Sequence, residues 1–148
     1  MNEKLTLELI RAADYAKRKA LIDLYFSSPV VTRVHMIVQV LHPDTKIPMW
    51  NAPLNFLDEG GQITLNISPS AVGHFAHTEN ETVLEARFNG KPERLMFDSG
   101  FIVAIIAFDE KTAIHSEVST MLFYPVADAQ DIKPAKPAAE RPALKLVK

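Results

Sequence analysis

The sequence predicts an α+β protein, mainly β, in which an N-terminal helix covers a small twisted sheet that closes toward a barrel or sandwich. Three observations support this fold class: a helical apolar stripe before Pro29, about six short segments with strand-like character between residues 30 and 124, and a Pro/Ala-rich tail after Pro125. With 148 residues, the chain is long enough for one domain with a substantial core.

Residues 4–28 are expected to form the helix, and Pro29 ends it because a proline disfavours the α conformation in the residue before it. Lys17, Arg18 and Lys19 are expected on the solvent side. The wide stripe on the other side either packs on its own domain or also takes part in self-association. Its members are Tyr15, Leu21, Ile22, Leu24, Tyr25 and Phe26.

Three strands are expected in the first half of the β region. Residues 30–40 are rich in β-branched side chains, which suits a largely buried strand, and residues 42–50 supply a turn and a short strand. Residues 62–68 alternate strictly, which predicts a strand with one buried face. Ile63, Leu65 and Ile67 are expected inside, and Thr64, Asn66 and Ser68 outside.

The second half continues the pattern. Residues 82–88 alternate, and Asn89-Gly90 is a hairpin signal before the next strand. Residues 101–108 are apolar throughout, so periodicity leaves a strand and a buried helical turn both open. Residues 116–124 are a last possible strand. Residues 127–148 have no aromatic side chain, and such a composition predicts disorder.

Composition restricts the function classes. A net charge of −2 gives no reason to expect nucleic acid or an anionic membrane as a partner. The absence of cysteine excludes disulfides and thiolate-ligated metals. No stretch approaches the ~20 apolar residues of a membrane span, and no targeting segment is recognisable, so the expected location is the cytoplasm.

Residues with catalytic or metal-binding potential are few. His74 and His77, with Glu79 and Glu81 nearby, lack a third ligand at a firm spacing and are expected in a solvated polar turn. Neither a nucleophile elbow nor a phosphate-binding glycine loop occurs in the sequence. We therefore expect no enzyme, no metal and no cofactor.

A binding surface is easier to find. Ala86 lies between Leu84 and Phe88 on one face of its strand, which either leaves a notch for a short apolar side chain or marks a close approach in the core. Asn66 and Ser68 offer hydrogen bonds, and the small residues 71–73 leave room for a peptide backbone. These features favour a peptide-binding module.

Four segments carry a family resemblance: "IPM" (47–49), "GQITLNISPSAVG" (61–73), "EARFNGKP" (85–92) and the terminal "RPALKLVK". Together they resemble the stringent starvation protein B family, the SspB adaptors of the ClpXP protease, over residues 12–108 and the last eight. The resemblance implies an Sm-like β-sandwich with N-terminal helices, a homodimer formed through the helical region, and a groove that holds the ssrA degradation tag of substrate proteins. It also implies that the tail docks on the N-terminal zinc-binding domain of ClpX.

The resemblance divides the chain into a tag-binding and dimerisation domain (1–126), a flexible linker (127–140) and a docking peptide (141–148). It assigns tag binding to Met49, Asn66, Ser68, Ala71, Val72, Ala86 and Phe88. It assigns ClpX docking to Arg141, Pro142, Ala143, Leu144, Lys145, Leu146, Val147 and Lys148. It assigns the dimer interface to Leu21, Leu24 and Tyr25.

The chain departs from the family pattern at Trp50 and residues 51–57, which lie where a shorter connection is expected and therefore put one rim of the groove in doubt. Two other hypotheses remain. An Sm-like RNA-binding module would show salt-sensitive RNA retention, although a pI near 6.2 argues against it. A small hydrolase built around His74 and His77 would bind zinc.

Overall fold

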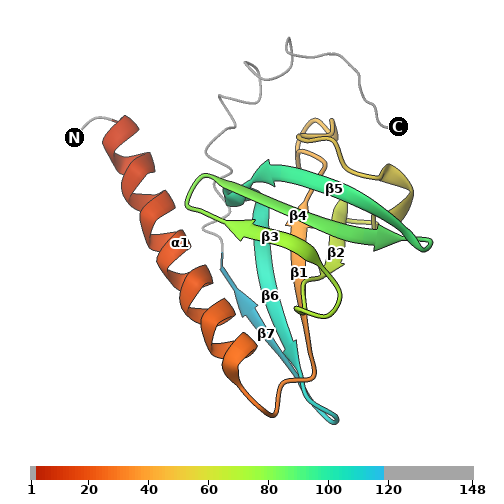
Figure 1. The fold of residues 1–148 in the computed structure, drawn as a ribbon. Coiled ribbons are helices and arrows are strands. Elements are labelled where there is room, and N and C mark those ends of the chain that lie inside the picture. Colours follow the sequence, from red (N-terminus) through yellow and green to blue (C-terminus); the bar gives the residue numbers. More distant parts are fainter. Residues whose placement is uncertain (1–2, 119–148) are drawn as a thin grey trace.

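The computed structural model describes residues 3–118, which form one helix followed by seven strands in two antiparallel sheets (Figure 1). The predicted class, α+β and mainly β, is confirmed. The elements are α1 (Glu3–Ser27), β1 (Arg33–Gln39), the 3₁₀ turn η1 (Leu54–Phe56), β2 (Gln62–Asn66), β3 (Gly73–His77), β4 (Glu81–Phe88), β5 (Lys91–Asp98), the 3₁₀ turn η2 (Ser99–Phe101), β6 (Ile102–Phe108) and β7 (Ala113–Glu117).

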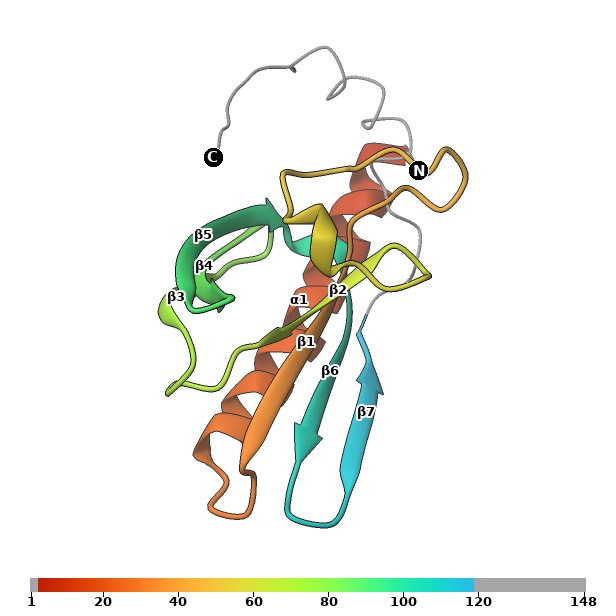
Figure 2. The ribbon, with the colours of Figure 1, turned by 90° about the vertical axis from the view of Figure 1, so that its right-hand side faces the viewer.

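The strand order is β2-β1-β6-β7 in the larger sheet and β3-β4-β5 in the smaller one. Figure 2 shows α1 behind the four-stranded sheet, with the three-stranded sheet beside it. β2 lies at one edge of its sheet, and β3 and β5 are the two edges of the other. The edge strand β2 of the larger sheet lies near the end of β4 in the smaller sheet. The candidate site lies between these two strands.

The alternation in residues 62–68 predicts the core correctly at three positions. Ile63, Leu65 and Ile67 are at most 2% exposed, and they pack with the inward residues of β1 in one continuous core. Ser68 is the exception, because it is buried rather than on the solvent side. Its Oγ accepts a hydrogen bond from the main-chain nitrogen of Val34 at 2.9 Å, which stabilises the burial of this hydroxyl.

The structure resolves the choice left open for residues 101–108: Ile102–Phe108 form strand β6, after the short turn η2. The hairpin expected at Asn89-Gly90 is confirmed, since both residues have positive φ, 54° and 81°, between the paired strands β4 and β5. Positive φ at both central residues is the requirement of a type I′ turn.

The helix ends at Ser27, as Pro29 predicts, and Lys17 and Lys19 are exposed as expected, but Arg18 is not. Arg18 is only 1% exposed and Asp14 only 4%, whereas Leu24 is 59% exposed. Arg18 is buried because its Nε donates a hydrogen bond to Nε2 of His77 on β3. The expectation that Arg18 faces solvent was therefore wrong.

Three strand expectations were also wrong. Residues 42–50 form no strand, and Pro48 makes only an isolated bridge to Leu41. The segment around His74 and His77 is strand β3 rather than a solvated turn, and it pairs antiparallel with β4. The last described strand, β7, spans Ala113–Glu117 and so begins before the expected residues 116–124. Among residues 3–118, no helix has the length and apolar character needed to cross a membrane.

Candidate peptide-binding groove

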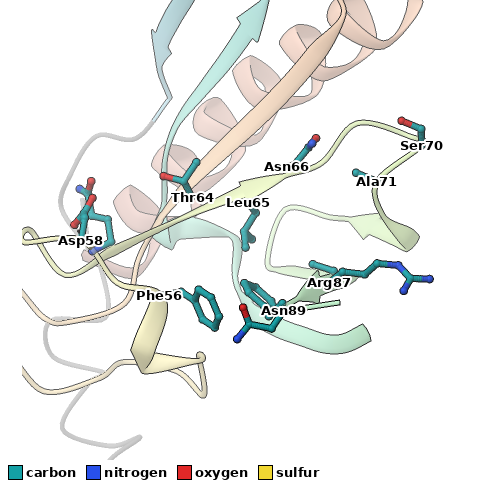
Figure 3. A pocket seen from close by; sticks show the side chains of 12 residues that line it. Phe56, Asp58, Thr64, Leu65, Asn66, Ser70, Ala71, Arg87 and Asn89 are labelled. Carbon is teal, nitrogen blue, oxygen red and sulfur yellow. Dashed lines mark hydrogen bonds between the residues drawn. The ribbon is translucent and has the colours of Figure 1, made fainter. Parts of the chain in front are cut away.

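A groove of about 520 Å³ lies between the edge strand β2 and the end of β4 (Figure 3). This volume lies within the usual range of ligand sites, roughly 300–1,000 Å³. The lining residues come from three places: Gln62, Thr64, Leu65 and Asn66 of β2, Ala86, Arg87, Phe88 and Asn89 at the end of β4, and Phe56, Asp58, Ser70 and Ala71 of the intervening loops. Figure 3 shows the side chains of Leu65 and Phe56 directed into the space between these elements.

The outer edge of β2 presents main-chain groups without a strand partner. Val40 N donates to Gly61 O, and Ile67 N donates to Val34 O, each at 2.9 Å, so Gly61 and Ile67 turn their main-chain groups toward β1. In an antiparallel pair, successive residues direct their main-chain N–H and C=O groups alternately toward the partner strand and away from it. Thr64 and Asn66 therefore direct their N–H and C=O groups away from β1, at the open edge of the described sheet.

The end of β4 has a second open edge. Thr78 N donates to Glu81 O at 2.9 Å, which shows that the odd-numbered residues of β4 turn their main-chain groups toward β3. Pairing with β3 extends no further than Gly73 opposite Glu85. Ala71, which would come next, donates its N–H to Ser68 O instead, at 2.7 Å. Within the described chain, the main-chain groups of Arg87 thus have no strand opposite them.

A smaller hollow of about 210 Å³ adjoins the groove where the chain leaves β4. Residues 70–73 form one side and residues 85–87 the other, and Ser70, Ala71, Ala86 and Arg87 border both spaces. A Cβ atom at Gly73 would lie 3.1 Å from a carboxylate oxygen of Glu85, so a side chain at this position would narrow the hollow. The two spaces form a continuous trough along open strand edges.

The structure brings most of the sequence-predicted groove residues together. Asn66, Ala71, Ala86 and Phe88 line the groove, and Val72 lines the adjoining hollow. The other two lie elsewhere: Ser68 is buried with its hydroxyl bonded to β1. Met49 is 8% exposed and belongs to the core, and its N–H donates to Val40 O at 2.6 Å.

Sequence reasoning missed Phe56, which lies 39% exposed on η1 and forms part of the groove wall. Its ring contacts that of Phe88, with 4.9 Å between centroids. The signal was present, since residues 51–57 were identified as a departure at the groove rim, but no local pattern predicts where a loop places one ring. Arg87 was also missed, and it supplies a positive charge on the side of the groove opposite Asp58 (Figure 3).

The histidines expected as a possible zinc pair have different roles. His74 is exposed, whereas both ring nitrogens of His77 are engaged, Nε2 by Arg18 and Nδ1 by Thr82 Oγ1 at 2.8 Å. Burial, followed by the charges of Arg18 and Lys19, lowers the pKa of His77 to about 4. No group of three or more His, Cys, Asp or Glu side chains in the described residues is arranged to hold a metal ion.

The residues expected at a dimer interface point in different directions. Tyr25 is buried, and its hydroxyl lies 3.1 Å from Ser116 Oγ of β7, while Leu21 is half-buried and Leu24 is exposed. The solvent side of α1 carries an apolar stripe of its own. It consists of Leu9, Ala13, Ala16, Ala20 and Leu24, all exposed and spaced three or four residues apart.

No protein-family model matches the sequence. The docking peptide expected at residues 141–148 and the linker at 127–140 lie outside the described residues.

Proposed function

We propose that this protein is an adaptor that binds an extended peptide, the ssrA-type degradation tag, and delivers the tagged protein to the ClpX unfoldase. The observation that carries the proposal is the groove bounded by two unpaired strand edges, one at Thr64 and Asn66 and the other at Arg87. Four of the seven residues that the resemblance assigns to tag binding line this groove, and a fifth lines the adjoining hollow.

The edges favour a peptide over a compact small molecule. Main-chain N–H and C=O groups that alternate along an open strand match the main chain of an added strand, whatever its side chains. Side chains on alternate residues of that strand then enter pockets, and the space above Ala86 is suited to a short apolar one. Each net hydrogen bond contributes about 1 kcal/mol, so a few of them together with one buried side chain add favourable free energy to peptide binding.

The helix supplies a surface for the homodimer that this proposal includes. The stripe of Leu9, Ala13, Ala16, Ala20 and Leu24 would bring two copies of α1 into close contact, since small residues let helix backbones approach. Leu24 belongs to the interface that the resemblance implies, whereas Tyr25 packs within its own domain. We therefore assign dimerisation to the stripe rather than to the side of α1 that carries Tyr25.

The adaptor role depends on the C-terminal residues. In this proposal Arg141–Lys148 bind the N-terminal domain of ClpX, with Leu144, Leu146 and Val147 providing apolar contacts, and residues 127–140 act as the tether. Linking two weak contacts raises the effective concentration of the tagged protein at ClpX without any further interface. This role places the protein in the cytoplasm, with no cofactor required.

The test is degradation of an ssrA-tagged fluorescent protein by ClpXP at limiting substrate, with the full chain and with a version that ends at Glu140. We expect the full chain to accelerate degradation. The shortened version should bind a labelled tag peptide with unchanged affinity but give no acceleration, because it lacks the docking peptide 141–148 that binds ClpX. An adaptor role is refuted if the full chain neither binds the tag nor changes the rate, and salt-sensitive RNA retention would then be measured.

A further inference from the structure

The groove has an aromatic end wall formed by Phe56 and Phe88. Phe56 of η1 and Phe88 of β4 face each other across 32 residues of sequence, with ring centroids 4.9 Å apart and planes inclined by 46°. This is a typical geometry for an attractive aromatic pair. Phe56 nevertheless remains 39% exposed, so the pair presents ring surface to the groove instead of filling the core.

The loop that carries Phe56 is fixed at both ends. At its start, Trp50 Nε1 donates to Gln39 O at 2.9 Å, and the Trp50 ring packs on that of Phe97 with centroids 4.7 Å apart. At its end, Asp58 Oδ1 accepts from the main-chain nitrogens of Gly60 and Gln62 at 2.8 and 3.0 Å. The ring is therefore held in place before any ligand binds, which reduces the entropy lost on binding.

The spacing between this wall and the Ala86 notch matches an extended peptide. Ala86 and Phe88 are two residues apart on one strand, and their side chains share a face. Alternate side chains of an extended chain lie about 6.7 Å apart. A peptide that lies along β4 and places one side chain above Ala86 consequently places the side chain two residues away against the ring of Phe88 or Phe56.

We propose that the Phe56–Phe88 wall makes this groove selective for peptides with a small residue and, two positions away, an aromatic or large aliphatic residue. The inference rests on the proposed peptide-binding function and names the substrate class that the groove prefers. Phe56 is the specificity-determining residue, because it lines the groove and its ring remains 39% exposed. The small residue enters the notch, and the large residue stacks on the exposed ring surface.

The experiment measures fluorescence anisotropy of labelled ssrA-tag peptides in which a single Phe is moved along the sequence, against the full chain, Phe56→Ala and Leu54→Ala. Leu54 lies on the same turn, is 52% exposed and does not line the groove, so it is the matched control. At one position we expect Phe to raise affinity about ten-fold over Ala for the natural chain and for Leu54→Ala, but not for Phe56→Ala. With Phe at that position, replacing the small residue two places away by Trp should cost at least as much.

Two results would overturn the inference in different ways. In the first, the natural chain binds the tag, but Phe56→Ala lowers the affinity of every peptide equally or changes the affinity of none. The wall then does not select a side chain, and only this inference fails. If the natural chain binds none of the peptides, the proposed function fails and the inference fails with it. Phe56→Leu provides a further check, because a large aliphatic side chain should restore most of the preference.

Discussion

His77 should make the stability of this fold depend on pH in the acidic range. Its Nε2 accepts a hydrogen bond from Arg18 Nε at 3.2 Å, so this nitrogen must be unprotonated in the folded protein. Burial is the main cause that lowers the pKa of His77, and the charges of Arg18 and Lys19 add to it. The ring also lies near Tyr15, 5.3 Å away between centroids, stacks on Phe75 and bonds to Thr82, all of them uncharged side chains.

The direction and size of the effect follow from proton linkage. The pKa of His77 falls from its ordinary 6.5 to about 4 on folding, so between these values the unfolded chain binds more protons than the folded chain. The stabilisation is complete above about pH 6.5 and is lost as the pH falls toward 4. At about 1.4 kcal/mol per pKa unit the shift corresponds to roughly 3 kcal/mol, and partial exposure of the ring to solvent reduces our expectation to about 2 kcal/mol.

The assay is urea unfolding at about pH 7 and pH 4.5 for the natural chain, His77→Gln and His74→Gln. Carboxylates also titrate in this range, so the informative quantity is the difference between variants. Because glutamine keeps an acceptor for Arg18 but does not titrate, His77→Gln should lose about 2 kcal/mol less than the natural chain on acidification. His74 is exposed on the same strand, and its variant should follow the natural chain. An unchanged acid sensitivity in His77→Gln would refute the reasoning.

Three further predictions concern the groove and the helix. Ala86→Leu should fill the space above Ala86 and weaken tag binding more than ten-fold in anisotropy titrations. Because Ala86 is only 7% exposed and packs in the core, the larger side chain should also lower the free energy of unfolding by about 1–3 kcal/mol; Ala76→Leu, at an exposed position of β3, should bind normally, and equal binding by both would exclude the notch. Gly61→Ala should lower the free energy of unfolding by about 2–3 kcal/mol. The φ angle of Gly61 is +76°, and the Cβ of an alanine at this position would lie 2.8 Å from the Cβ of Leu41. A loss below about 0.5 kcal/mol in urea unfolding would contradict this prediction. Leu24→Asp should convert a dimer to monomer in sedimentation at micromolar concentration while leaving tag affinity unchanged, and a persistent dimer would remove the stripe as the interface.

Local sequence signals predicted the elements whose structure is decided locally. The alternation of residues 62–68 depends only on which face of one strand is buried, and the Asn89-Gly90 turn depends on two residues that tolerate positive φ. Strand β3 gave no such signal, because Gly73–His77 contains two histidines and no alternation of apolar residues. Arg18 was misplaced for a related reason: its partner His77 is 59 positions away, and a helical pattern cannot reveal such a partner.

In the candidate site, too, some features follow from local sequence and others only from the assembled fold. The sequence showed Ala86 between two larger side chains but left a notch and a close approach in the core both open. In the structure Ala86 lines the groove and is also packed in the core, with only 7% of its surface exposed. The open edges follow from where pairing stops, at Glu85 on β4 and at the end of the sheet on β2, and pairing is a property of the assembled sheets. Phe56 joins the wall because a loop anchored by Trp50 and Asp58 brings it there.

An open strand edge is a liability, because it can pair with any extended chain and cause aggregation. The shortness of β2 limits this liability. β2 has five residues, and at about 3.3 Å per residue it offers roughly 16 Å of edge, enough for a segment of about five residues. Phe56 and Asp58 border this edge at one end, and the loop at Ser70 and Ala71 borders it at the other. A neighbouring sheet cannot enter so short a trough, whereas the flexible end of a tagged chain can. If the proposed adaptor function is correct, residues of a tag beyond the trough should add little to its affinity and stay accessible to the unfoldase.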